Sequence, residues 1–141
     1  MRYHFQIHKE DKGYWAECVE IPACVTQGET KEEIVKNMQD AINTYLEEPR
    51  DSHFLAPLPQ EDIKISKNII EVSLDPEIAL AFLVRYYRIQ EGLTQKEAAK
   101  KLGMKNLFSY QRLETRCNAT LEMLVKIVNL FPHLSLDLVL E

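Results

Sequence analysis

The sequence predicts an α+β protein: a small antiparallel sheet with one covering helix, followed by an all-α part. The first 72 residues alternate short apolar and polar stretches with turns, whereas the remainder has apolar residues at helical spacing. The balance of charge changes at the same place. Residues 1–72 contain 8 basic and 14 acidic side chains, whereas residues 73–141 contain 9 basic and 8 acidic side chains. We therefore expect two domains, 1–72 and 73–141, whose partners have opposite charge.

Four strands are expected in the front domain. Residues 2–8 alternate apolar and polar side chains, which is the pattern of a half-buried strand. A polar turn at 9–13 leads into a second strand at 14–20, and a short third strand follows at 24–27. The β-branched stretch 68–72 predicts a fourth strand, which can pair within this sheet or across a dimer.

One amphipathic helix is expected to cover the sheet. Thr30, with Glu33 three residues later, is a capping box. Apolar residues then recur at helical spacing to about Glu48, and Pro49 ends the helix. Residues 49–62, which are rich in proline and charge, predict a loop or linker. A sheet with one covered face is a natural two-layer domain.

The back domain is predicted to contain four helices and a leucine-rich tail. Asp75 caps the first helix, and Pro76 occupies its first position. Thr94, with Glu97 three residues later, is a second capping box, and Gly103 turns the chain toward a third helix. The helices are expected at about 75–90, 94–102, 105–116 and 120–130, and the tail at 134–140 is a strand or a short helix that packs on the chain or on a second subunit.

Two helices around a tight turn are the arrangement that places one helix in a DNA major groove. Residues 85–116 contain 8 basic and 3 acidic side chains, a local charge of +5. Leu107, Tyr110 and Leu113 are expected to dock on the preceding helix, and Phe108 is expected in the core. Asparagine and glutamine can read adenine, arginine can read guanine, and basic groups or helix-start amides suit phosphates. The candidate DNA contacts are Gln95, Lys96, Lys105, Asn106, Ser109, Gln111, Arg112 and Arg116.

Two stretches of the front domain resemble a known family. They are GYWAE at 13–17 and IPACVTQGET at 21–30, and the helix ending in Tyr45-Leu46 follows them. Together they resemble the HicB antitoxin family over residues 1–72, with Ala23 where that family usually has glycine. The resemblance implies a partial ribonuclease-H-like domain that binds and blocks a small ribonuclease toxin, HicA. The candidate toxin contacts are Tyr14, Trp15, Glu17, Glu32 and Glu33.

A second resemblance covers residues 78–131. The run GLTQKEAAKKLG at 92–103, then Arg112-Leu113-Glu114 and TLEML at 120–124, is similar to the Cro/C1-type (XRE) helix-turn-helix family. Between Gly103 and Glu114 the chain is one residue longer than the usual pattern. The positions that read bases therefore depend on the register of the third helix.

No catalytic residue, metal site or cofactor is predicted. A two-metal phosphodiesterase needs several carboxylates around hard cations, but the first strand has no acidic residue. Glu17 and Glu20 are three apart on the expected second strand and should face opposite sides. His4 and His8 share a strand face that we expect to meet solvent, and nothing completes a metal ligand set. The three cysteines, odd in number, are expected to be reduced and buried.

The preferred hypothesis is an antitoxin that autorepresses a type II HicA/HicB toxin–antitoxin operon. The acidic front domain would cover a small basic ribonuclease, and the back domain would bind double-stranded operator DNA as a dimer or tetramer. One alternative is a one-component transcription regulator that senses a small ligand near Tyr14 and Trp15, and another is a nuclease guided to DNA. No apolar run approaches the ~20 residues of a membrane helix, and the N-terminus lacks an apolar signal region, so we expect a cytoplasmic protein without membrane contact.

Overall fold

The structure is a computed structural model that describes residues 1–47 and 55–141. It divides into two compact units: a front unit that includes residues 1–46 and 55–75, and a back unit that is mainly Pro76–Leu140. The expected helix end at Glu48 and Pro49, and residues 49–54 of the expected linker, lie outside the described residues. The α+β class and the small antiparallel sheet are confirmed.

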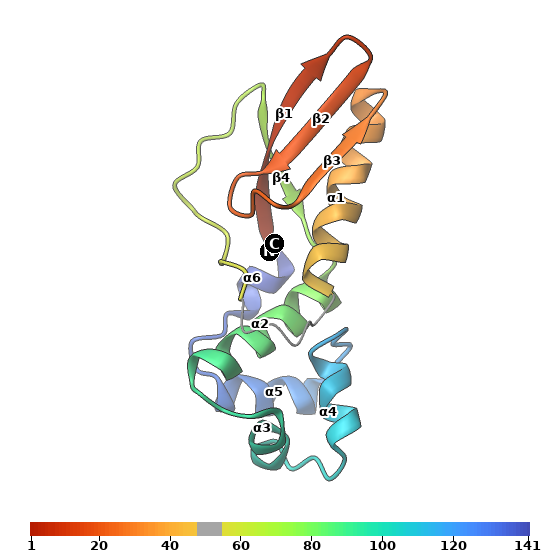
Figure 1. Cartoon of the computed structure of the whole chain (residues 1–141). Helices are drawn as coiled ribbons and strands as arrows, with labels where there is room; N and C mark the ends of the chain where they lie inside the picture. The colour runs from red at the N-terminus through yellow and green to blue at the C-terminus, as the bar shows by residue number, and fades with distance from the viewer. Residues whose placement is uncertain (48–54) are drawn as a thin grey trace. The chain divides into compact units, whose positions relative to one another are not determined.

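In its described part, the front unit is a four-stranded antiparallel sheet in the order β3-β2-β1-β4, with helix α1 beside it (Figure 1). The fourth strand pairs with β1 inside this sheet, which settles the alternative of pairing across a dimer. Tyr3, Phe5 and Ala16 are fully buried, whereas their neighbours along the strands belong to the other face. The elements are β1 (Arg2–Glu10), β2 (Gly13–Cys18), β3 (Val25–Gly28), α1 (Lys31–Glu47) and β4 (Ile69–Ser73).

The start of α1 is fixed by a cap and by a close approach. The Thr30 hydroxyl accepts a hydrogen bond from the Glu33 amide at 3.1 Å, as the capping box predicts. The Glu33 carboxylate instead accepts from the Glu29 amide at 3.3 Å. A Cβ on Gly28 would lie 2.8 Å from the Ile34 nitrogen, so glycine is required where β3 meets α1. The helix then buries one residue per turn: Ile34, Met38, Ile42 and Leu46.

The back unit is built around helix α2, in which every residue from Ile78 to Val84 is buried. Both halves of the capping box at Thr94 are present, and Gly103 takes the positive φ of 73° that the turn requires. The leucine-rich tail forms a short helix that packs on α2. Within the described ranges, none of the helices is both long and apolar enough to span a bilayer. The helices are α2 (Pro76–Gln90), α3 (Gln95–Lys101), α4 (Leu107–Leu113), α5 (Leu121–Leu130) and α6 (Leu136–Leu140).

Helix α4 departs from the prediction. It is shorter than the expected 105–116, because Asn106 caps its start and Glu114 its end. Tyr110 is fully buried as expected, but Phe108 is 66% exposed, and its expected place in the core is wrong. Tyr110 and Glu114, four residues apart, define the inner side, and Phe108, two residues before Tyr110, points away from it. Leu107, the first residue of the helix, is 42% exposed and so does not dock as expected.

Candidate functional site

The open face of the sheet presents an aromatic and charged group. His8 on β1 lies opposite Trp15 on β2, and their rings stack with centroids 4.1 Å apart and planes 15° from parallel. The His8 Nε2 atom is 3.1 Å from the Glu17 Oε1 atom. All three side chains are partly exposed. The stack and the hydrogen bond hold Trp15 in one orientation, so this group offers a preformed contact surface.

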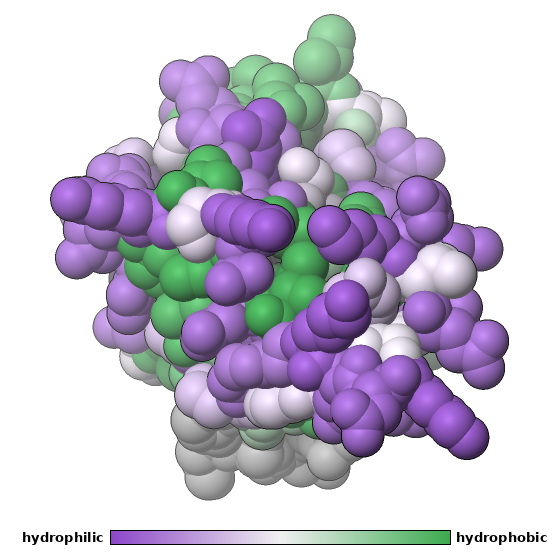
Figure 2. Space-filling view, turned by 90° about the horizontal axis from the view of Figure 1, so that it is seen from above, coloured by the Kyte–Doolittle hydropathy of each residue, from purple (hydrophilic) through white to green (hydrophobic). Residues whose placement is uncertain are grey.

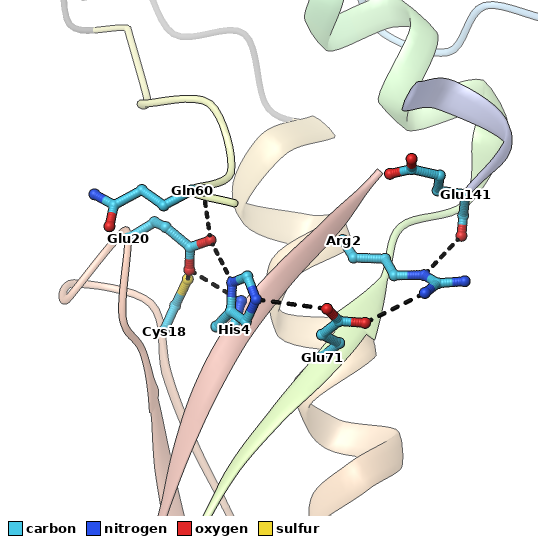
Figure 3. A network of polar contacts seen from close by, with 7 residues as sticks. All are labelled: Arg2, His4, Cys18, Glu20, Gln60, Glu71 and Glu141. Carbon is cyan, nitrogen blue, oxygen red and sulfur yellow. Dashed lines mark hydrogen bonds and ion pairs between the residues drawn. The ribbon is translucent and has the colours of Figure 1, made fainter. Parts of the chain in front are cut away.

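A second histidine–carboxylate pair on the same strand is buried (Figure 3). The side chain of Glu20 is fully buried and accepts hydrogen bonds from His4 Nδ1 and from the His4 amide, both at 2.9 Å, and from the Gln60 amide at 3.2 Å. On the other side of the ring, His4 Nε2 lies 3.7 Å from Glu71, which also accepts a hydrogen bond from Arg2. The network ties β1, the bend after β2, β4 and the segment around Gln60 together.

Two predictions about these residues are wrong. His4 was expected to meet solvent but is 4% exposed. Glu17 and Glu20 were expected on opposite sides, but both contact histidines from one face of β1. The cause is the end of β2 at Cys18: residues 19–20 form a bend, so the two-residue alternation stops before Glu20.

The buried network is structural in character. Burial raises the pKa of the Cys18 thiol beside Glu20 to about 12, so this thiol stays protonated and unreactive at neutral pH. In the part of the chain that the structure describes, no cluster of three or more His, Cys, Asp or Glu residues is placed to hold a metal ion. All three cysteines are free and buried, as expected.

The candidate toxin contacts do not form one surface. Trp15 and Glu17 lie on the open face of the sheet. Tyr14, which pairs with Gly28 on the neighbouring strand β3, lies on the other face. Glu32 and Glu33 are exposed in the first turn of α1. The end of the unit that carries the β1–β2 turn is largely hydrophilic, with smaller hydrophobic areas between the polar side chains (Figure 2). The candidate contacts are thus divided between the two faces of the sheet and the first turn of α1.

In the back unit, a buried carboxylate joins α2, α3 and α4. The Glu114 side chain is fully buried and accepts from Arg88 Nε at 2.7 Å and from Gln95 Nε2 at 2.9 Å. The Gln95 oxygen in turn accepts from Gln111 Nε2 at 3.1 Å. We call these four residues the Glu114 clasp. It fixes α3 against α4 and engages two of the candidate DNA contacts, Gln95 near the expected phosphate contacts and Gln111 in the expected groove-facing set.

Two further candidates also have partners inside the unit. The Asn106 Oδ1 atom accepts from the Phe108 amide at 2.8 Å, which is the helix-capping geometry. Arg116 pairs with Glu77 at 3.0 Å. The capping role of Asn106 could have been predicted from the sequence, because asparagine strongly prefers the position that caps a helix start. The pairing of Arg116 had no signal in the sequence, because Glu77 is 39 residues away.

Exposed cations dominate α3, the turn and α4. Between Gln95 and Leu113 the only acidic residue is Glu97, whose carboxylate belongs to the capping box. The candidate DNA contacts Lys96, Lys105 and Arg112 are exposed, and so is Ser109 on α4. Lys100 and Lys101, which were not among the candidate DNA contacts, are exposed on the same helix as Lys96. No ion pair within residues 1–47 and 55–141 engages the group that we call the basic segment: Lys96, Lys100, Lys101, Lys105 and Arg112.

No protein-family profile matches the sequence. The chain is 26% identical over 134 residues to "Antitoxin HicB 1" of Photorhabdus laumondii, covering 94% of this chain and 83% of that protein. It is 33% identical over 91 residues to "Antitoxin HicB" of Escherichia coli, covering 64% of each, which is less than two thirds of that relative. It is 39% identical over 62 residues to "UPF0150 protein ssr1765" of Synechocystis sp., covering 43% of this chain and 76% of that protein.

Proposed function

We propose, since the chain belongs to the family of HicB antitoxins and UPF0150 proteins, that it is the antitoxin of a type II toxin–antitoxin pair. Its front unit binds a small HicA-like ribonuclease and blocks it. Its back unit is a helix-turn-helix domain that binds operator DNA as a dimer or tetramer and represses the operon that encodes both proteins. The chain itself needs no catalytic step for this role.

The basic segment carries the DNA-binding part of the proposal. Five exposed cations without carboxylate partners among the described residues lie on α3, the turn and α4. Phosphate neutralisation by such groups supplies most of the sequence-independent affinity for DNA. The Glu114 clasp holds α3 and α4 rigidly, and a fixed helix pair is what major-groove docking requires. Capped starts at Thr94 and Asn106 support the same arrangement.

Binding of the full chain to duplexes that tile the DNA directly upstream of its own coding sequence tests this part. We expect specific, salt-dependent binding, measured by fluorescence anisotropy. Arg112→Ala should weaken it by about 1–3 kcal/mol if the guanidinium reads a guanine. Lys126→Ala, on α5 outside the basic segment, is the matched control and should bind like the wild type. Absence of salt-dependent binding by the full chain would overturn the DNA-binding role.

The charge and the aromatic group of the front unit support toxin binding. Residues 1–72 hold 14 acidic and 8 basic side chains, which would speed encounter with a cation-rich ribonuclease. Trp15 is partly exposed and held by the His8 stack, and a preoriented tryptophan is the residue type that most often dominates interface energy. We place the centre of the toxin interface at the open face, around Trp15 and Glu17.

Co-expression with the small basic protein encoded beside this chain tests the toxin-binding part. The two should co-purify, and the chain should restore growth of cells that produce the ribonuclease. Trp15→Ala should raise the dissociation constant by about thirtyfold or more, since a central tryptophan contributes about 2 kcal/mol or more. Glu32→Gln with Glu33→Gln tests α1 instead, and Lys36→Ala on the same helix is the control. A larger effect of the α1 double variant would move the interface to that helix, and failure to co-purify would refute the antitoxin role.

A further inference from the structure

Among the described residues, the exposed large hydrophobic side chains include one aromatic ring, that of Phe108 on α4. Phe108 is 66% exposed, while Tyr110, two residues later, is fully buried. Exposing a phenylalanine leaves a large apolar area in water. Its backbone position is fixed, because the Phe108 amide donates to Asn106 Oδ1 at 2.8 Å in the helix cap. This exposed aromatic ring, on a helix whose start is capped, is available to a partner outside the chain.

The surroundings of Phe108 indicate the chemistry of that partner. Gln111 and Arg112, three and four residues along the helix, are its neighbours on the helix surface, and both are exposed. Ser109 and Lys105 are exposed close to it in the sequence. The ring thus lies inside the basic segment, and the surrounding charge is complementary to a polyanion. The other strongly exposed hydrophobic residues of the back unit, Leu121, Val125 and Leu140, belong to α5 and to the end of α6.

Duplex DNA presents one apolar group in its major groove, the 5-methyl group of thymine, and phenylalanine is among the side chains that contact it. We infer that Phe108 is a specificity-determining residue that packs against thymine methyl groups of the operator. This inference rests on the proposed DNA-binding function. The polar and cationic neighbours position the helix on the duplex, and Phe108 selects sites with thymine beneath the first turn of α4.

Substitution of deoxyuridine for single thymines of the bound duplex tests the inference, because it removes the methyl group and leaves the hydrogen-bonding edge unchanged. The wild-type full chain should lose about fourfold in affinity for each contacted methyl group, the value of one buried methyl-sized group at about 0.8 kcal/mol. Phe108→Ala should bind the thymine duplex more weakly and should bind thymine and deoxyuridine duplexes equally. Leu121→Ala, which changes a hydrophobic residue of α5 that is 82% exposed, should keep the wild-type methyl sensitivity.

Four outcomes would overturn the inference, and each points to a different conclusion. Wild-type binding that is insensitive to every deoxyuridine substitution would exclude a methyl contact while leaving the DNA-binding function intact. Methyl sensitivity that survives in Phe108→Ala would assign the contact to another residue. A change of mass in sedimentation for Phe108→Ala, with methyl sensitivity kept, would assign the ring to an interface between copies. Absence of any duplex binding by the wild type would refute the proposed function together with this inference.

Discussion

The Glu114 clasp gives the sharpest stability prediction. Glu114→Gln keeps the shape of the side chain but removes its charge, and its amide nitrogen would replace an oxygen that now accepts from Arg88 or Gln95. The side chain of Arg88 is 13% exposed, so its charge would remain largely buried without a counterion. Removing one partner of a buried pair costs about 3–5 kcal/mol, and the retained oxygen places this variant near the lower value. For a unit of this size, a loss of about 3 kcal/mol lowers the melting temperature by roughly 12–24 °C.

Urea unfolding followed by far-UV circular dichroism measures the effect, because the back unit holds most of the helices. The single tryptophan of the chain, Trp15, lies in the front unit and provides an internal reference by fluorescence. Glu122→Gln is the matched control, since that side chain is 83% exposed and its pair with Lys126 should contribute nothing measurable. Replacing both partners, with Arg88→Met and Glu114→Leu, should destabilise less than Glu114→Leu alone. Equal stability of Glu114→Gln and the wild type would refute the reasoning.

Three further predictions concern the cap, the tight packing and the buried thiols. Thr94→Ala removes the hydroxyl of the capping box and should cost about 1 kcal/mol in the circular dichroism transition, and an unchanged midpoint would contradict the cap. Gly28→Ala forces a methyl group to within 2.8 Å of the Ile34 nitrogen. It should lower the free energy of unfolding of the front unit, followed by tryptophan fluorescence, by about 1–3 kcal/mol, and an unchanged free energy would show that β3 can move. Burial raises the pKa of Cys18 to about 12 and that of Cys117 to about 11, so these thiols ionise first in the unfolded chain. The free energy of unfolding should therefore fall as pH rises from about 9 through 11, by up to about 1.4 kcal/mol per unit for each thiol, and Cys117→Ala should flatten this slope.

The elements of the protein follow from local signals in the sequence. The caps at Thr30 and Thr94 begin α1 and α3 where they were expected, because a cap depends on residues only three apart, although the complete capping box forms at Thr94 and not at Thr30. The pairing of β4 with β1 was left open, since the sequence does not say whether a distant strand pairs within its own sheet or with a second subunit. The tail was also open between strand and helix, because seven residues rich in leucine fit either period.

The side-chain partners could not be predicted in the same way. Glu20 was assigned to a strand face by alternation, but a bend after Cys18 turned it toward His4. Phe108 was assigned to the core because aromatic residues usually are buried, but the cap at Asn106 fixes the rotation of α4 so that Tyr110 occupies the inner side. The place where β2 ends decides the face of Glu20, and the side of α4 that packs inward decides the exposure of Phe108; both depend on three-dimensional packing.

Pairing also decides which cations a polyanion can meet. Of the eight basic residues between 85 and 116, Arg88 and Arg116 contact carboxylates, and burial lowers the pKa of Arg85. The remaining five are the basic segment, all on α3, the turn and α4. The local charge of +5 counted from the sequence does not show where the unpaired cations lie. In the structure they lie on α3, the turn and α4. Lys101→Ala should therefore reduce the salt dependence of DNA binding by about 0.9 in the log–log slope, whereas Arg85→Met should leave this slope unchanged.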